Sequence, residues 1–439
     1  MRTAPALRAT ALTAAALLAV SACGGSDEGT GSTDDTAKQV NVYGADGDMN
    51  NGLGEDFTTS GALAGMRGTV LLTDLGQDFR DRLLEIDPSL TDFNTAGETY
   101  DAVVVTALAA QLAGSNAATA FGPYVNGTTS GGQVCTTPAD CLAVVAAGGN
   151  PDYDGLAGPL GFTDAGEPSQ GSYAIESFTD DNQIDTGART FQLVGDAADA
   201  ATDEGPAPAA PGTTGSPLVI GSLTPQTGSL SYQGLQQLAA LQLAVADVNA
   251  AGGVLGAPVQ LVTGDSGDAS TDIATQTTDR LLAGGVNAVV GASSSGVSLT
   301  VIDKITGAGV LMISPASTSD TLTDYDDGGL FFRTVPPDTL QARALADLIG
   351  GDGNNTVGIL ALNDPYGVGL ADNTRADLIG DGLDEDDVVE VVYDPQAANF
   401  DAEVQQMVGL NPDAILVIGF EEAGKVIAGL NEQGIGPQR

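Results

Sequence analysis

The pattern of apolar positions is clearest in the second half of the chain, where short apolar runs alternate with segments of helical periodicity. Residues 235–248 repeat apolar side chains at the spacing of one helix face, and Gly252 and Gly253 follow as a stop. The predicted strands are 218–220, 259–262, 286–290, 310–313, 330–335, 357–362, 388–393 and 415–418. The predicted helices are 235–248, 271–282, 297–305, 369–379, 400–408 and 423–430. A run of βα units with short loops predicts an α/β fold, with mostly parallel sheet covered by helices on both faces.

The first half shows the same pattern less regularly. Its predicted elements are strands 38–43 and 68–73, helices 79–86 and 100–112, and extended segments 155–162 and 172–177. Between the halves, residues 197–217 are rich in Pro, Ala and Gly, which predicts a flexible linker without core residues. About 400 residues remain after the N-terminal region, more than one hydrophobic core holds, so two lobes are expected.

The N-terminus is typical of an export signal. Arg2 and Arg8 accompany an apolar run at 9–20, which is shorter than the roughly 20 residues of a membrane span. The run leads to Val20-Ser21-Ala22-Cys23, which resembles a bacterial lipobox. We therefore expect a signal peptide at 1–22, a lipid on Cys23 and a flexible tether over 23–37, holding an extracytoplasmic protein to the cell membrane. The alternative is an ordinary cleaved signal peptide with a cysteine nearby by chance.

Composition excludes several classes of function. The formal net charge of −44 argues against nucleic-acid binding, which needs a basic surface. The chain contains no histidine, so a Ser-His-Asp or Cys-His nucleophile and a His-rich zinc site are absent, and no lysine completes a P-loop. We expect no enzyme activity, cofactor or metal. An enzyme that uses carboxylates alone, such as a glycosidase, stays open in principle, although no spacing indicates one.

The two remaining cysteines lie close together. Cys135 and Cys141 flank the polar loop TTPAD. Outside the cytoplasm, this spacing favours a disulfide that closes a small loop. The alternative is a pair of reduced, buried thiols.

Several motifs resemble one known family. They are Gly221-Ser222-Leu223-Thr224-Pro225-Gln226-Thr227-Gly228, Val248-Asn249-Ala250-Ala251-Gly252-Gly253-Val254, Ser314-Pro315-Ala316-Ser317-Thr318 and Asn363-Asp364-Pro365-Tyr366-Gly367. With them, residues 217–439 resemble the first two-thirds of a type I periplasmic binding protein of the branched-chain amino-acid class. Residues 38–195 resemble the family's last third, through Gly44-Ala45-Asp46-Gly47, Tyr100-Asp101-Ala102, Tyr153-Asp154-Gly155 and Gly158-Pro159. The resemblance implies a two-lobed fold with a hinge between the lobes.

The order of these parts departs from the family, because its final third comes first. The resemblance implies that 38–195 holds the end of lobe 2 and then the second part of lobe 1, with a linker at 196–216. Lobe 1 would begin at 217–335, and lobe 2 would follow at 336–439. Joining Arg439 to Lys38 would restore the usual order, which predicts a circular permutation. The alternative is a scrambled reading of the gene.

The resemblance also implies a ligand site between the lobes. The loop 293–296, through Ser295, would bind a carboxylate at the start of the following helix, where free N–H groups suit an anion. Ser295 is alternatively only the N-cap of that helix. Ala316 and Thr318 would contact the ligand through backbone and hydroxyl groups. Asp46 would pair with an ammonium group, although most acids in so acidic a chain face solvent.

Three aromatic residues complete the implied site. Tyr366 and Phe420 match pocket residues of the second lobe, and Tyr232 matches a residue near the mouth. Core packing is the alternative for each of them. Leucine-type binders tend to carry a tyrosine at the Phe420 position, so the missing hydroxyl argues against leucine, isoleucine or valine as the ligand.

Together these observations predict the solute-binding component of an ABC importer. It would be a monomer that captures an amino acid of the branched-chain type, or a related small zwitterion or amide, and delivers it to permease and ATPase subunits. The alternative is a ligand-sensing lipoprotein that signals to a membrane partner without transport.

Overall fold

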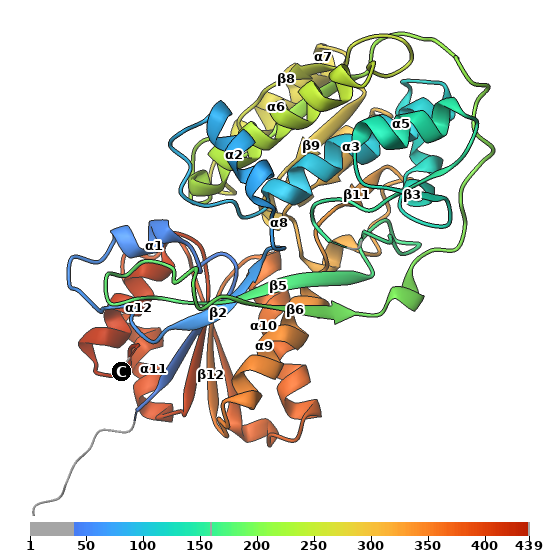
Figure 1. Cartoon of the computed structure of the whole chain (residues 1–439). Helices are drawn as coiled ribbons and strands as arrows, with labels where there is room; N and C mark the ends of the chain where they lie inside the picture. The colour runs from blue at the N-terminus through green and yellow to red at the C-terminus, as the bar shows by residue number, and fades with distance from the viewer. Residues whose placement is uncertain (1–38, 159, 438–439) are drawn as a thin grey trace, which may run out of the picture. The chain divides into compact units, whose positions relative to one another are not determined.

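Two large sheets organise the protein, and each carries helices on both faces (Figure 1). The computed structural model describes residues 39–158 and 160–437. The predicted signal peptide, Cys23, the tether and Lys38 lie outside the described residues. The predicted α/β fold of two lobes is confirmed.

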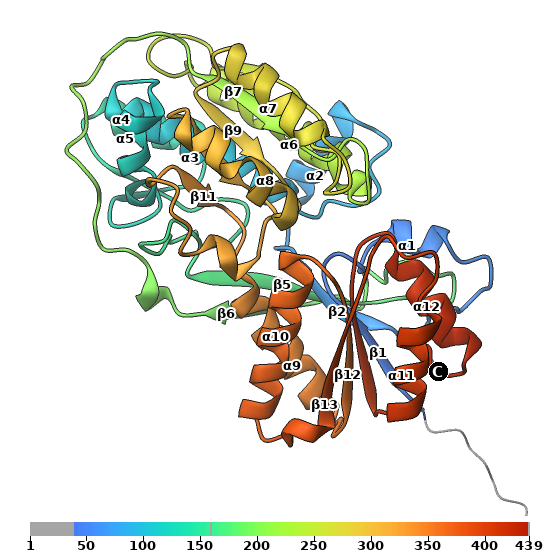
Figure 2. The ribbon, with the colours of Figure 1, turned by 180° about the vertical axis from the view of Figure 1, so that it is seen from behind.

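Lobe 1 is built on a five-stranded parallel sheet with the order β11-β10-β9-β7-β8. Its strands are β7 (Val219–Leu223), β8 (Gln260–Val262), β9 (Ala288–Gly291), β10 (Leu311–Ser314) and β11 (Phe331–Arg333). Its main helices are α2 (Gln77–Ile86), α3 (Ala96–Ala113), α6 (Gly234–Ala250), α7 (Ile273–Ala283) and α8 (Ser295–Gly307). Helices α3 and α6 pack together on one face, and α7 and α8 pack together on the other (Figures 1 and 2).

Lobe 2 is built on a seven-stranded sheet with the order β13-β12-β14-β1-β2-β5-β6. Its strands are β1 (Asn41–Gly44), β2 (Arg67–Leu71), β5 (Gln170–Ser177), β6 (Thr190–Gly195), β12 (Val357–Leu362), β13 (Val388–Tyr393) and β14 (Ala414–Ile418). Its helices are α1 (Asn51–Glu55), α9 (Asp338–Gly351), α10 (Pro365–Gly380), α11 (Asp401–Leu410) and α12 (Ala423–Glu432). The sheet is parallel from β13 to β2, and β5 and β6 add antiparallel strands at one edge.

Strand β1 joins the two ends of the described chain in one sheet. It pairs in parallel with β14 on one side, with Asn41 opposite Ala414, and with β2 on the other. Both views place the last described residues on the side of the sheet where β1 begins (Figures 1 and 2). The chain therefore fills the middle of this sheet with its first described strand and builds one edge with its last third.

Four segments connect the lobes: 72–76, 154–169, 196–218 and 334–337. One of these connections was not predicted. After its part in lobe 1, the first half returns to lobe 2 through β5 and β6. The sequence pattern predicted an extended segment at 172–177 but gave no indication of its sheet.

The segment between β6 and β7 lies along lobe 1. Its Ala209 N–H donates to the Leu112 carbonyl at 2.7 Å, and its Ala201 N–H donates to the Phe162 carbonyl at 2.7 Å. Ala201 is only 7% exposed. The expectation of a linker without core residues is therefore wrong at Ala201. Its methyl side chain is small enough to be buried where this segment lies against lobe 1.

In the segment 155–162, where the sequence predicts extended chain, the described residues 155–158 and 160–162 form no strand, and Phe162 makes a single bridge to Pro168. Asp101 explains the difference. Its carboxylate accepts hydrogen bonds from the Tyr153 hydroxyl at 2.6 Å and the Ala157 N–H at 2.7 Å, so the chain turns around this side chain. A backbone held by a buried carboxylate has no free donors for a sheet ladder at that point.

A small subdomain of lobe 1 was not predicted. It consists of α4 (Ala118–Phe121), β3 (Gln133–Cys135), α5 (Pro138–Ala146) and β4 (Pro151–Tyr153). Cys135 ends β3, Cys141 lies in α5, and the two form a disulfide. Thr137 caps α5 by accepting from the Asp140 N–H at 3.1 Å, and Pro138 follows at the first helical position.

Within the described ranges, no single helix is long and apolar enough to cross a membrane. One bent pair, Ala96–Ala113 with Ala118–Tyr124, passes by length and composition alone, and its two parts meet at 83°.

Candidate functional site

The first part of the site is the turn that begins α8. Ser294 is the N-cap of this helix, and its hydroxyl accepts from the Val297 N–H at 3.3 Å. The alternative that Ser295 is the N-cap is therefore wrong, because the helix begins one residue earlier. The Ser295 hydroxyl instead accepts the backbone N–H groups of Thr318 and Ser319, each at 3.1 Å. Ser295 thus holds the neighbouring loop against the start of α8.

That neighbouring loop follows β10 and reaches lobe 2. The Thr318 carbonyl accepts from the Asp338 N–H at the start of α9 at 2.8 Å. The Ser319 hydroxyl donates to the Pro365 carbonyl at the start of α10 at 2.9 Å. Ala316 is half-buried, and its N–H already donates to the Ser314 hydroxyl at 3.3 Å. The loop therefore brings lobe 1 to the first turns of two helices of lobe 2.

Asp46 follows β1 and points to the same region from lobe 2. Its Oδ1 accepts from the Tyr366 hydroxyl at 2.7 Å and from the Gln341 Nε2 at 3.0 Å. Burial raises the pKa of Asp46, and these two hydrogen bonds oppose that shift. The residue after it needs to be Gly47, since a Cβ there would lie 2.1 Å from the Gly419 carbonyl oxygen.

The aromatic residues surround Asp46. Tyr366 stacks on Phe420, with ring centroids 5.4 Å apart and planes 8° from parallel. The Tyr232 hydroxyl of lobe 1 donates to the Gly47 carbonyl of lobe 2 at 3.0 Å. Tyr366 is buried, whereas Phe420 and Tyr232 are partly exposed. The structure thus gathers Asp46, Tyr366, Phe420 and Tyr232 in one cluster.

Two further carboxyl groups of this region were missed from the sequence. Asp48 and Asp338 are fully buried, and hydrogen bonds to their carboxylates from neighbouring groups offset that burial only in part. Burial raises the pKa of both well above the ordinary value, and the charge of Asp46 adds to the shift. One signal could have found Asp338, because it opens α9 three residues before Gln341, on the same helix face.

A cavity of about 250 Å³ opens beside this cluster. Lobe 1 lines it with Ser229, Leu230 and Ser294, and lobe 2 lines it with Asp364 and Phe420, among others. Of the seven predicted contacts, Phe420 is the one among the described residues that lines this cavity. Burial raises the pKa of Asp364 to about 6.

The cavity has no basic side chain among its described lining residues, and no group of three or more potential metal ligands occurs in the described ranges. A buried carboxylate is favourable only when it meets a cation or hydrogen-bond donors. The region around Asp46 therefore suits a ligand with a positively charged donor group, and the start of α8 suits one with a negative group.

Comparison with known families assigns this architecture. A family model described as "periplasmic binding protein" matches residues 217–439. The chain belongs to the periplasmic binding protein family. Its relatives place it in the type I class that includes binding proteins for branched-chain amino acids, as the sequence motifs predicted.

The relatives match this periplasmic binding protein over about half of its length. The Leu/Ile/Val-binding protein BraC3 of Rhizobium johnstonii is 30% identical over 213 residues, covering 48% of this chain and 57% of the relative. The chemotactic signal transduction system substrate-binding protein BasB of Halobacterium salinarum is 29% identical over 214 residues, covering 47% and 50%. A crystal structure of LivJ from Streptococcus pneumoniae in complex with isoleucine is 28% identical, with a TM-score of 0.44, covering 50% and 62%. Each match thus spans less than two-thirds of the relative.

Proposed function

We propose that this periplasmic binding protein captures a small amino-acid-like zwitterion between its two lobes. One observation carries the proposal: the Asp46 carboxylate of lobe 2 and the start of α8 in lobe 1 belong to one connected cluster. Ser295 bonds the loop that contacts α9 and α10, and side chains of those two helices bond Asp46. A negative group in lobe 2 and a helix N-terminus in lobe 1 match the two charges of an amino acid.

The chemistry of each end follows from these partners. The N–H groups at the start of α8 and the hydroxyls of the loop 293–296 would receive the ligand carboxylate. Asp46 would receive the ammonium, with Tyr366 and Gln341 fixing its orientation. Thr318 and Ala316 would border the carboxylate, and burial between the lobes would strengthen both contacts by excluding water.

The side chain of the ligand would lie against the aromatic residues. Tyr366 and Phe420 offer a stacked apolar face, and Tyr232 borders it from lobe 1. An apolar side chain of branched-chain size, or a related small zwitterion or amide, would pack on this face, although the missing hydroxyl at Phe420 argues against leucine, isoleucine and valine themselves. Phe420 has no hydroxyl to offer, so ligands that need a donor at that point would bind less tightly.

We further propose that the protein works outside the cytoplasm, anchored by a lipid on Cys23, as the binding component of an ABC importer. The disulfide of Cys135 and Cys141 supports an oxidising compartment.

A sensing role is the second candidate, and the name of the Halobacterium salinarum relative supports it. Replacing Cys23 by Ser would release the protein from membranes. Uptake of the radiolabelled ligand, abolished by deletion of the gene, would favour transport over sensing.

The binding proposal is tested by thermal shift against a panel of amino acids, amides and other small zwitterions. A ligand that binds the native state raises Tm, and the stabilisation grows with the logarithm of its concentration over its Kd. Asp46→Ala should abolish the shift, whereas the control Asp181→Ala, at an exposed loop position, should retain it. A ligand that shifts both variants equally would contradict the role of Asp46. The absence of any shift across the panel would contradict an amino-acid-like ligand.

A further inference from the structure

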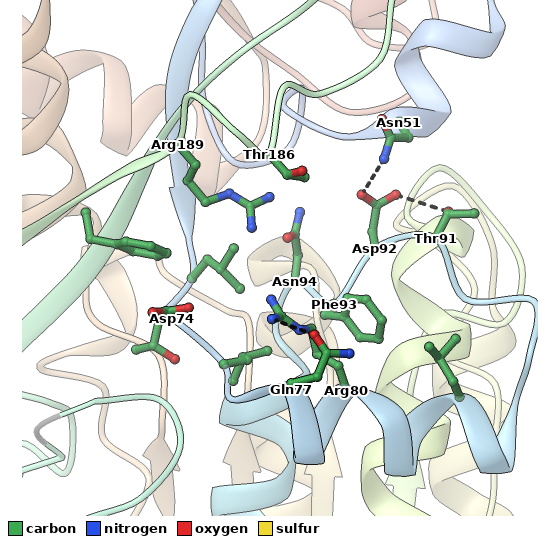
Figure 3. A pocket seen from close by; sticks show the side chains of 15 residues that line it. Asn51, Asp74, Gln77, Arg80, Thr91, Asp92, Phe93, Asn94, Thr186 and Arg189 are labelled. Atoms are coloured by element: carbon green, nitrogen blue, oxygen red, sulfur yellow. Dashed lines mark hydrogen bonds between the residues drawn. The ribbon is translucent and has the colours of Figure 1, made fainter.

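A second cavity, of about 540 Å³, lies beside the connection 72–76 between the lobes (Figure 3). Both lobes line it. Lobe 1 contributes Gln77, Arg80 and Asn94, and lobe 2 contributes Asn51, Thr186 and Arg189. None of the seven residues of the proposed amino-acid site lies in its described lining. Its volume is within the range of small-molecule sites.

Arginine is frequent in this cavity for so acidic a chain, although Asp74 and Asp92 also line it. The protein has 14 basic residues against 58 acidic ones, yet two arginines face this one space. Arg80 is in no ion pair with a described residue, and its Nη2 donates only to the Gln77 amide oxygen at 3.3 Å. Arg189 pairs with the buried Glu176, but its Nε is buried without an acceptor. The cavity therefore holds guanidinium donors that are not fully used.

The amide of Asn94 adds a third donor. Asn94 is 6% exposed, and Figure 3 shows its amide directed into the space between Arg189 and Asp92, with no hydrogen bond to another lining residue. The acidic groups nearby are occupied or solvated. Asp92 accepts from the Asn51 Nδ2 at 3.0 Å and from the Thr91 hydroxyl at 3.3 Å, and Asp74 is exposed.

A buried donor without an acceptor is unfavourable, because it has lost its hydrogen bonds to water without replacement. Arginine forks match the geometry of a carboxylate, and such charge-assisted hydrogen bonds are the stronger ones. We propose that this cavity is a second binding site, for a small solute that carries a carboxylate, held by Arg80, Arg189 and Asn94.

A hydrogen-bonded relay joins this cavity to the start of α8. Thr95, next to Asn94, has a left-handed backbone with φ of 61°, which is rare for a β-branched residue. Its hydroxyl accepts from the Gln237 Nε2 at 2.9 Å, and the Gln237 Oε1 accepts from the Ser293 hydroxyl at 2.8 Å. Strain of this kind concentrates at functional positions. A solute bound at Asn94 is thus two side chains away from the loop 293–296.

The test uses a fluorescent reporter, because the chain contains no tryptophan. Phe93 lines the cavity, so Phe93→Trp places a single indole there. Acetate, succinate, glutamate and glycine betaine are titrated at constant ionic strength, with acetamide and chloride as probes that lack a carboxylate. At least one carboxylate should give a saturable change in emission, and acetamide and chloride should give none.

Matched variants decide whether the cavity is responsible. Arg80→Gln in the reporter background should weaken the carboxylate by about tenfold or more, the loss expected for a charged hydrogen bond. Arg375→Gln, on the outer part of α10, should leave it unchanged. The response should persist with Asp46→Ala, which removes the proposed ammonium contact of the amino-acid site.

Three results would overturn the proposal. They are no saturable response to any of the four carboxylates, equal responses with and without Arg80, and loss of the response in Asp46→Ala. Should Phe93→Trp fail to fold, calorimetric titration of the unmodified protein and of Arg80→Gln with the same probes decides the same question. A solute bound in this cavity also raises Tm, and it should do so equally in Asp46→Ala. A response in this cavity with no panel ligand whose Tm shift depends on Asp46 would leave the second site standing and contradict only the amino-acid site.

Discussion

The hydroxyl of Tyr366 donates a 2.7 Å hydrogen bond to the carboxylate of Asp46, a residue 320 positions earlier in the chain. Tyr366 lies in the first turn of α10, and Asp46 directly follows β1. The bond therefore connects the segment that the family model matches, 217–439, with a segment that lies outside that match. It also fixes the orientation of the carboxylate that we assign to the ligand ammonium.

Tyr366→Phe should weaken ligand binding while leaving the fold intact. The phenyl ring keeps its stack on Phe420, but Asp46 retains only Gln341 as a side-chain donor. A hydrogen bond to a charged group contributes about 1.5–3 kcal/mol, so affinity for the ligand found in the thermal-shift panel should fall roughly 10- to 100-fold. Calorimetric titration measures the change.

The matched control is Tyr325→Phe. The Tyr325 hydroxyl also donates to a carboxylate, that of Asp303, but at an exposed position outside the site. The affinity of Tyr325→Phe for the same ligand should equal that of the unmodified protein. If Tyr366→Phe binds as tightly as this control, the hydroxyl has no part in orienting Asp46 for the ligand.

Glu167→Gln should strongly destabilise the protein. Arg333 is 1% exposed, and its guanidinium donates to the Glu167 carboxylate and to the carbonyls of Ser317 and Ser319, the latter at 2.8 Å. Removing the Glu167 charge leaves a buried guanidinium without its counter-charge. Loss of one partner of a buried pair costs about 3–5 kcal/mol.

Urea unfolding monitored by circular dichroism measures this cost. Glu385→Gln is the control, because Glu385 pairs with Arg375 at an exposed position, where an ion pair contributes about 0–1 kcal/mol. Equal, small losses in both variants would show that Arg333 does not depend on Glu167.

Much of the fold could be predicted, because buried strands of a parallel sheet appear in the sequence as short, nearly continuous apolar runs. The strand predicted at 357–362 matches β12, all of whose residues are buried, and the strand predicted at 388–393 matches β13. The return of β5 and β6 to lobe 2 could not be predicted. The antiparallel pairing of β5 with β2, on which β6 then adds, depends on contacts more than 100 residues apart, which local periodicity does not encode.

The site was harder to predict than the fold. Asp46 was predicted from the family resemblance, which implies an acidic residue at that position, and its contact with a ligand stays a prediction. Asp48 and Asp338 were missed, because the sequence of a chain with 58 acidic residues does not distinguish a buried carboxylate from a solvated one. The spacing to Gln341 on α9 is a signal for Asp338 alone, and the burial of Asp48 depends on how the loop after β1 packs in space. The contacts of Ser295 with Thr318 and Ser319 likewise depend on two loops meeting in space.

Glu98→Gln should change how stability depends on pH. Burial raises the pKa of Glu98 from 4.5 to about 8, and the neighbouring Asp101 adds to the shift. Between these two values the folded state binds more protons than the unfolded state, so the free energy of unfolding falls as pH rises from about 4.5 to about 8. The neutral glutamine removes this contribution.

The variant should therefore gain stability over the unmodified protein at pH 8.5, by up to about 2–4 kcal/mol, and gain less at pH 5. Urea unfolding at the two pH values measures the difference. Glu85→Gln, at an exposed position of α2, should show no such dependence. A gain for Glu98→Gln of the same size at both pH values would contradict the assigned titration.

The order of the segments can be tested by rearranging them. A chain that runs through 217–437 and then 39–196 would restore the order that the family motifs imply. It should fold, because β1 already lies in parallel between β14 and β2, and α12 would precede β1 as the helix of a βα unit. The segment 197–216, with its single buried Ala201, would lose its connecting role.

The rearranged chain should show the same far-ultraviolet circular dichroism and respond to the same ligand in the thermal-shift panel. A second rearrangement, opened inside the fully buried β12, is the control and should not fold, because it interrupts a strand that pairs on both sides. If the restored order fails to fold while the natural chain binds its ligand, the two segments do not form one permuted unit. If both rearrangements fold, folding of the restored order is no evidence that the chain is permuted at the junction between α12 and β1.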